Sequence, residues 1–167
     1  MQIRFETTTD IRVVHALNRA AFATRAEADL VDALRASAQP IVSLVADDAG
    51  TIVGHILFSP VTLTGHQNLR IMGLAPMAVD PARQRQGIGS ALVRDGLDCC
   101  RQIGSAAVVV LGHAAFYPRF GFVPASRFGI ACEYQVPDEV FMAMELEPGI
   151  LVDRRGVIRY HAAFGNA

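Results

Sequence analysis

The chain has 167 residues, of which 51% are hydrophobic and 19% charged, so its composition is that of a folded protein rather than a disordered segment. The formal net charge of −1, without any cluster of Lys and Arg, argues against a nucleic-acid partner. No apolar run reaches the roughly 20 residues that cross a bilayer, and the first residues lack the order of a signal peptide. We therefore expect one compact domain over residues 1–167, located in the cytoplasm and without a membrane partner.

The positions of cysteine and histidine give no sign of a metal site. Two of the three cysteines, Cys99 and Cys100, are neighbours in sequence, and such pairs seldom form a disulfide or a Cys-x-x-Cys metal clamp. Four histidines lack the spacing of metal ligands: His15, His55, His66 and His161. We expect no bound metal, and we expect the cysteines to be small core residues in a reducing compartment.

The first part of the chain shows the patterns of one strand and two helices. Residues 2–7 alternate polar and apolar side chains, which is typical of a half-buried strand. Asp10 stands where it can cap the first helix. Thr24 and Glu27 have the spacing of a capping box ahead of the second helix, which Pro40 ends.

Three β-rich runs follow the two helices. Residues 41–46 and 51–59 are joined by residues 47–50, whose composition suits the turn of a hairpin. The third run covers residues 70–79. We therefore expect two antiparallel strands and a third strand that leads toward the middle of the chain.

The second half of the chain predicts a helix and several strands. Residues 88–103 place apolar side chains at nearly four-residue spacing, which indicates a helix with one face on a sheet, and Gly104 can end it. Residues 106–111 are short and continuously apolar, as in a central strand covered on both faces. A strand, a helix and a buried strand in this order predict a parallel crossover. Residues 141–146 predict a later strand, and residues 157–164 another strand or an ordered tail.

A glycine-containing turn between a strand and a helix points to a phosphate site. Residues 77–92 end the third β-rich run, make a polar turn and open the helix, so that free N–H groups and the positive helix end point to one spot. Gly87 and Gly89 remove side chains that would block a close approach. Leu92 stands where a dinucleotide fingerprint needs a third glycine, and the Gly-Lys-Ser/Thr of a P-loop is absent. A helix-entry turn without a ligand is the alternative interpretation.

The same segment resembles the acetyl-CoA-binding motif of the GNAT superfamily, Gln/Arg-x-x-Gly-x-Gly/Ala, with Gln84, Gly87 and Gly89 in the defining places. Residues 108–113 and 116–122 resemble the next strand of the family and its Tyr-x-x-x-Gly-Phe segment, and the similarity is closest to the YhbS-like group of predicted acyltransferases. The resemblance implies an α/β fold with a mixed, mostly antiparallel central sheet flanked by helices. Two neighbouring parallel strands would splay apart in that sheet and hold the cofactor.

The resemblance also implies acetyl-CoA as the co-substrate. Backbone groups of the strand before the motif would pair with the pantetheine arm. Pro76 lies in that strand and cannot donate a ladder hydrogen bond, which favours a bulge, although a simple unpaired strand position is the alternative. The residues implied in cofactor binding are Met77, Ala78, Val79, Gln84, Arg85, Gln86, Gly87, Ile88, Gly89 and Ser90.

Two residues are candidates for the chemical step. Tyr117 occupies the position of the family's general acid, which would donate to the departing thiolate, and a packed aromatic residue with a hydrogen-bonded hydroxyl is the alternative. Many relatives carry a glutamate as the base on the strand before the motif, but residues 71–79 contain no acidic side chain. His113 could accept the proton directly or through water, or it is a structural histidine.

The acceptor side is implied by family geometry alone. Glu27 and Arg25 at the junction of the first two helices, together with residues 127–139, are expected to border the acceptor, although a capping box already accounts for Glu27. We therefore expect an N-acetyltransferase that acts by direct attack of a primary amine, carried by a small molecule or a protein.

Two other classes of function are alternatives to this expectation. A noncatalytic acyl-CoA sensor that acts through a partner surface is the main alternative, but such a sensor would have no need of Tyr117. A toxin that acetylates aminoacyl-tRNA is disfavoured by the net charge of −1. A homodimer is compatible with the apolar late strands.

Overall fold

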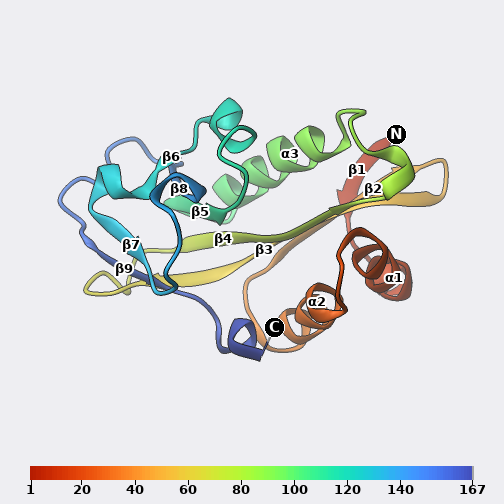
Figure 1. The fold of residues 1–167 in the computed structure, drawn as a ribbon, viewed down its shortest axis with the longest axis horizontal. Coiled ribbons are helices and arrows are strands. Elements are labelled where there is room, and N and C mark those ends of the chain that lie inside the picture. Colours follow the sequence, from red (N-terminus) through yellow and green to blue (C-terminus); the bar gives the residue numbers. More distant parts are fainter. Residues whose placement is uncertain (167) are drawn as a thin grey trace.

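The computed structural model describes residues 1–166, which are built around a mixed β-sheet (Figure 1). The strands are β1 (Gln2–Phe5), β2 (Val42–Asp48), β3 (Thr51–Leu63), β4 (Ile71–Val79), β5 (Ala107–Leu111), β6 (Val123–Pro124), β7 (Ile130–Cys132), β8 (Phe141–Glu145) and β9 (Gly156–Arg159). Neighbours follow the order β1-β2-β3-β4-β5-β8-β6, and β9 joins β3 and β7 at the side. Within this range every pairing is antiparallel except those of β4 with β5 and β7 with β9.

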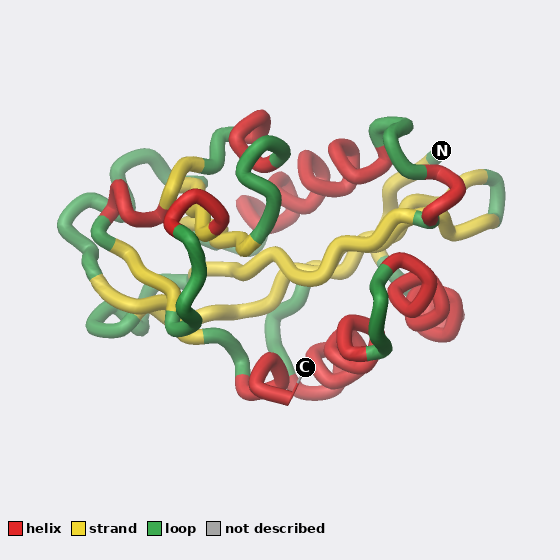
Figure 2. The backbone as a smooth tube through the Cα atoms, viewed as in Figure 1, coloured by secondary structure: helices red, strands yellow, loops and turns green. Residues whose placement is uncertain are grey.

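Helices cover both faces of the sheet, as the red and yellow tubes of Figure 2 show. They are α1 (Ile11–Ala21) and α2 (Ala26–Ser37) on one face and α3 (Ile88–Gln102) on the other. Successive residues of a strand point to opposite faces, so Leu57 of β3 packs with Val14 and Val31 under α1 and α2, whereas Phe58 packs with Leu92 under α3. Across residues 1–166, no helix combines the length and the apolar character that a bilayer crossing needs.

Short 3₁₀ turns connect several of these elements. They are Thr8–Asp10, Pro81–Arg83, Tyr117–Phe120, Ala125–Phe128, Asp138–Val140 and Ala162–Asn166. The turn Pro81–Arg83 lies between β4 and α3, and the turn Tyr117–Phe120 follows β5. Both turns therefore stand next to the only parallel strand pair on the main path of the sheet over residues 1–166.

The sequence predicted most of the regular elements. The first strand, the hairpin of β2 and β3, the third run β4, helix α3 and the buried strand β5 are confirmed, and β4 and β5 are parallel as the crossover requires. The tail contains both a strand, β9, and a 3₁₀ turn. Strands β6 and β7 were not predicted, because elements of two and three residues carry no readable alternation.

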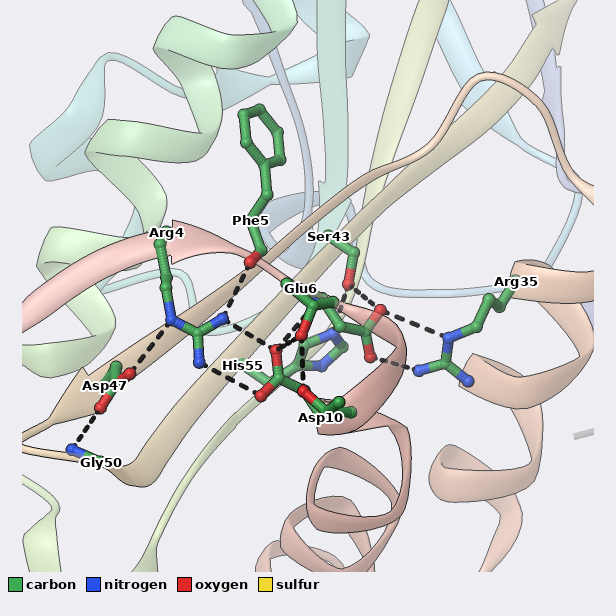
Figure 3. A network of polar contacts seen from close by, with 11 residues as sticks. Arg4, Phe5, Glu6, Asp10, Arg35, Ser43, Asp47, Gly50 and His55 are labelled. Carbon is green, nitrogen blue, oxygen red and sulfur yellow. Dashed lines mark hydrogen bonds and ion pairs between the residues drawn. The ribbon is translucent and has the colours of Figure 1, made fainter.

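Asp10 does not act as the helix cap that the sequence suggested. It directly precedes α1 but makes no capping hydrogen bond to that helix. Its Oδ2 instead accepts a hydrogen bond from Arg4 Nη1 at 2.8 Å (Figure 3). The same oxygen accepts a hydrogen bond from the backbone N–H of Thr7 at 2.8 Å. The Arg4 guanidinium holds the pKa of the Asp10 carboxyl well below its usual range. Asp10 therefore ties β1 to the turn that precedes α1.

Candidate active site

The parallel pair β4 and β5 separates part-way along its length. The two strands pair only as far as Leu74 with Val110, and β4 continues to Val79 beyond that point. On its other side, three residue steps of β4 from Leu74 to Met77 face two steps of β3, which is the register shift of a β-bulge. The bulge lies around Pro76, so the irregularity predicted at this proline is confirmed.

A cavity of about 630 Å³ lies beside this separation and the N-terminus of α3. Its walls come from the end of β4, from the turn that opens α3 and from the segment after β5. The lining residues are Met77, Val79, Gln84, Arg85, Gly87, Ile88, Gly89, Ser90, His113, Phe116, Tyr117 and Arg119. All of them except Phe116 and Arg119 were predicted as site residues from the sequence.

The turn that opens α3 presents backbone N–H groups to the cavity. Arg85 and Gly87 have φ angles of +64° and +84°, the left-handed conformation that lets the chain turn sharply into the helix. The first N–H groups of a helix have no acceptor within it, and the helix dipole makes this end positive. Gln84 Nε2 donates to the carbonyl of Val79 at 3.4 Å, which fastens the turn to the end of β4.

Gly89 keeps a narrow gap open in the cavity wall. A Cβ atom placed on it would lie 3.5 Å from Met77 Cε and 3.8 Å from the ring of Phe116. These are ordinary contact distances, so the fold accepts a methyl group there, but any longer side chain has to extend between the two walls. The absence of a side chain at Gly89 therefore keeps the space between Met77 and Phe116 open, and no left-handed backbone conformation requires a glycine there.

Two guanidinium groups give the cavity a positive wall. Arg85 and Arg119 both line it, and neither takes part in an ion pair within the described range. Arg119 lies over the ring of Phe116, with 5.0 Å from its guanidinium carbon to the ring centroid. No carboxylate belongs to the lining formed by residues 1–166. A helix N-terminus with two unpaired cations is suited to an anionic phosphate group.

Tyr117 reaches the cavity from the 3₁₀ turn after β5. It is 6% exposed, and its ring makes edge contacts with Phe116 and Phe122 at centroid distances of 5.0 and 5.7 Å. Burial raises the pKa of its hydroxyl to about 12, so the group keeps its proton at neutral pH. No group within residues 1–166 forms a hydrogen bond with this hydroxyl, which keeps some accessible surface, and Tyr117 is one of the residues that line the cavity.

His113 stands between β5 and the turn that carries Tyr117. Its side chain is exposed at the rim of the cavity. Its carbonyl accepts hydrogen bonds from the N–H groups of Phe116 at 3.1 Å and Tyr117 at 3.4 Å. The backbone of His113 therefore helps to form the turn that carries Tyr117, and a role of its imidazole as a base stays a prediction.

Four of the predicted residues lie outside the cavity lining: Ala78, Gln86, Arg25 and Glu27. Ala78 is buried on the opposite face, because side chains alternate along β4 and its neighbours Met77 and Val79 take the α3 face. Gln86 is exposed, and its Oε1 accepts from Arg83 Nε at 3.2 Å. A backbone contact of Ala78 or Gln86 with a cofactor stays a prediction.

The predicted acceptor residues lie at the start of α2. Arg25 forms an ion pair with Asp29 at 2.9 Å, and Glu27 accepts a hydrogen bond from Thr24 Oγ1 at 3.3 Å. Helix α2 covers the face of the sheet opposite to α3 (Figure 1). The acceptor roles of Arg25 and Glu27 therefore stay predictions.

Sequence reasoning missed Phe116 and Arg119. Both stand beside Tyr117 in a turn, and such a short turn has no periodicity from which the direction of a side chain can be read. A usable signal was present, because the segment 116–122 holds four aromatic residues around one Pro-Arg pair. Such a density of aromatic residues on a polar turn indicates a contact surface rather than a solvent loop.

The structure combines a mixed sheet, a parallel strand pair that separates and a glycine-containing turn at a helix N-terminus, with one cavity beside them. These features define the class of acyl-CoA-dependent N-acyltransferases. Comparison with known proteins agrees with this class. The family model described as acetyltransferase (GNAT) domain matches residues 40–124. The chain belongs to the GNAT family of acetyltransferases.

Similar proteins extend over nearly the whole chain. The uncharacterised N-acetyltransferase YhbS of Escherichia coli (strain K12) is 39% identical over 165 residues, which are 98% of each protein. The crystal structure of YhbS from Escherichia coli in complex with CoA has a TM-score of 0.92 and 37% identity, covering 98% of this chain and 91% of that one. A GNAT acetyltransferase from Brucella melitensis in complex with acetyl-CoA has a TM-score of 0.81 and 36% identity, covering 98% and 97%.

Proposed function

We propose that this protein transfers the acetyl group of acetyl-CoA to a primary amine of a small molecule or a protein, by direct attack and with Tyr117 as the general acid. The single observation that carries the proposal is Tyr117 itself, which lines the cavity and whose hydroxyl forms no hydrogen bond within residues 1–166. One continuous sheet that contains strands from both ends of the chain supports a single catalytic domain over residues 1–167.

The residues of the cavity fit the parts of acetyl-CoA. The N–H groups at the head of α3, with Arg85 and Arg119, would hold its phosphate groups, and the end of β4 at Met77 and Val79 would lie along the pantetheine arm. When bound, this co-substrate supplies an acyl group activated as a thioester. We propose no metal, because the lining contains a single imidazole and neither a thiolate nor a carboxylate in the described chain.

Tyr117 would act on the leaving sulfur. The acceptor nitrogen forms a bond to the acyl carbon, the bond from that carbon to sulfur breaks, and the proton lost by the amine is balanced by the proton gained by the thiol. A hydroxyl with a pKa of about 12 is present as the donor at neutral pH. Because a thiol has a reference pKa of about 8.5, its anion leaves fairly well unaided, and a hydrogen bond from Tyr117 is sufficient help.

No side chain stands out as a dedicated base. Residues 71–79 contain no carboxylate, and His113 is the one imidazole among the described lining residues. A lysine-like amine has a reference pKa of about 10.4, so about one molecule in 2500 is neutral at pH 7. We propose that the acceptor loses its proton to water and that His113 assists little.

Thiol release with a panel of primary amines distinguishes an enzyme from an acyl-CoA sensor. We expect amine-dependent release of CoA thiol, with the matching acetylated amine seen by mass spectrometry. Tight binding of acetyl-CoA without turnover on small amines or on lysine and N-terminal peptides would support the sensor instead. The presence of Tyr117 at the cavity favours turnover, since binding alone has no use for a proton donor at this position.

A further inference from the structure

Gly112 lies directly against the ring of Tyr117. A Cβ atom built on Gly112 would be 2.3 Å from Tyr117 Cε2, 2.9 Å from Cδ2 and 3.3 Å from Cζ. Carbon atoms that are not bonded rest about 3.5–4.0 Å apart. The ring therefore occupies the space that any side chain at position 112 would need.

The backbone conformation does not explain this glycine. Gly112 is not one of the glycines with a positive φ angle, so its backbone lies in a region open to other residues. Its N–H donates to the carbonyl of Val140 at 3.0 Å, and its neighbour Leu111 pairs with Phe141 of β8. The chain at Gly112 is thus fixed by the sheet, and what the position requires is the missing Cβ.

The ring of Tyr117 is also held on its other sides. Phe122 is 2% exposed and makes an edge contact with it, as does Phe116. A methyl group at position 112 would have to push the ring by about 1 Å to restore a normal contact. A displacement of about 1 Å at a reacting group can reduce the rate about 100-fold.

We infer that Gly112 is a positioning residue for Tyr117: the bare glycine at the end of β5 sets where the tyrosine hydroxyl enters the cavity. This inference rests on the proposed function, because it takes Tyr117 as the proton donor. Gly112 itself does not line the cavity, so its effect on the reaction passes through the tyrosine.

Gly112→Ala is tested against a matched control, Gly96→Ala. A Cβ on Gly96 would lie 2.3 Å from Phe58 Cε2, so the same methyl group meets an aromatic ring at the same distance, inside the core under α3. Both variants should melt at a lower temperature. Only Gly112→Ala should lower kcat, by up to about 10-fold and by no more than Tyr117→Phe does, while the Kd for acetyl-CoA changes less than about threefold.

A double variant separates positioning from general damage. In the background of Tyr117→Phe the hydroxyl is gone, so adding Gly112→Ala should lower kcat by less than about twofold further. If Gly112→Ala costs as much in that background as in the wild type, the glycine acts through something other than the hydroxyl and the inference is wrong. If Tyr117→Phe alone leaves turnover unchanged, the proposed role of Tyr117 fails first, and the inference falls with it.

A readout independent of activity follows the ring itself. The chain has three tyrosines, so incorporation of 3-fluorotyrosine gives three ¹⁹F resonances, and Tyr117→Phe identifies the one from Tyr117. Gly112→Ala should shift that resonance, and Gly96→Ala should leave it in place. An unmoved resonance with unchanged kcat would overturn the inference.

A second variant covers the case in which Gly112→Ala does not fold. Gly112→Ala with Phe122→Leu gives the ring room to move away, and Phe122→Leu alone is its reference. We expect the pair to fold with a shifted Tyr117 resonance and a kcat several-fold below that reference, with a loss no larger than that of Tyr117→Phe. Equal kcat values would contradict the inference.

Discussion

Most polar side chains under α1 and α2 are paired with one another, whereas several polar side chains of the cavity are not. Under α1 and α2, Glu6 forms an ion pair with Arg35 and accepts a hydrogen bond from Ser43, and Ser43 meets the ring of His55 at 2.9 Å (Figure 3). On the α3 face, the Arg85 and Arg119 guanidinium groups of the cavity form no ion pair within the described residues, and the Tyr117 hydroxyl forms no hydrogen bond there. Polar groups that are paired with one another hold the fold together, whereas those left unpaired in a cavity are free to bind a ligand.

The paired face also fixes the protonation of its histidine. Ser43 donates to Glu6, so it accepts from Nε2–H of His55, and the other ring nitrogen then accepts from Asn18 Nδ2 at 3.4 Å. Burial, with a smaller contribution from Arg35, lowers the pKa of His55 to about 3. This histidine is neutral at pH 7 in the folded protein, and it lies on the face of the sheet opposite to the cavity.

The largest effect that we expect is a loss of stability in acid, caused by His55 in the polar network under α1 and α2. The folded pKa of His55 is about 3, below the reference value of 6.5, so the unfolded chain binds the extra proton between these values and stability falls as the pH falls. The free energy of unfolding should decrease by about 1.4 kcal/mol per pH unit below about pH 6.5. Urea melts of the wild type and of His55→Gln, compared from pH 7 to 4.5, check this, and parallel slopes would contradict it.

Filling the cavity on the α3 face should abolish the stabilisation of the protein by acetyl-CoA. Acetyl-CoA at about 100 times its Kd should add about 2.7 kcal/mol to the free energy of unfolding of the wild type. Gly89→Leu places a long side chain between Met77 and Phe116, so we expect a folded protein whose melting temperature no longer rises with acetyl-CoA. Ala91→Leu, on the same helical turn but outside the cavity lining, should keep the rise. A full rise in Gly89→Leu would place the cofactor elsewhere.

Removing the unpaired hydroxyl should slow the chemical step and leave binding intact. Tyr117→Phe keeps the ring contacts and loses only the donor, so kcat should fall by about 10-fold, at the low end of general-acid effects, with an unchanged Kd for acetyl-CoA. Single-turnover kinetics, in which chemistry limits the rate, are the measurement. Equal rates in both proteins would reassign Tyr117 to packing.

The smallest effect is expected at the exposed rim. His113→Ala should lower kcat less than Tyr117→Phe does, because the acceptor amine loses its proton to water. Turnover should rise with pH toward the pKa of the acceptor, and Tyr117 adds no alkaline decline below about pH 11, since its own pKa is about 12. A limb near pH 6 to 7 that disappears in His113→Ala would make His113 the base instead.

Most of the fold and most of the cavity lining could be predicted from the sequence, but the contacts between distant segments could not. Alternation and apolar spacing predicted β1 to β5 and α3, and Gly87 and Gly89 predicted the sharp turn into α3, because local patterns encode these features. The fit of Tyr117 against Gly112 depends on two segments meeting in space, and no sequence spacing reports it. Asp10 shows a related limit, because its side chain bonds to Arg4 of β1 and to the N–H of Thr7 and makes no capping hydrogen bond to α1.

The shortness of the pairing between β4 and β5 gives the sheet an edge in its interior. An exposed strand edge invites other chains to add a strand, and proteins usually protect it with charge or proline. Here the edge beyond Leu74 lies in a walled space, between the start of α3 and the turn after β5. An added polypeptide strand would lie about 4.8 Å from β4 and would need room for side chains on both faces of the sheet. A slender unbranched chain needs only enough room to contact the free backbone groups of β4. We therefore expect this enclosed edge to accept a slender chain and to exclude an added polypeptide strand.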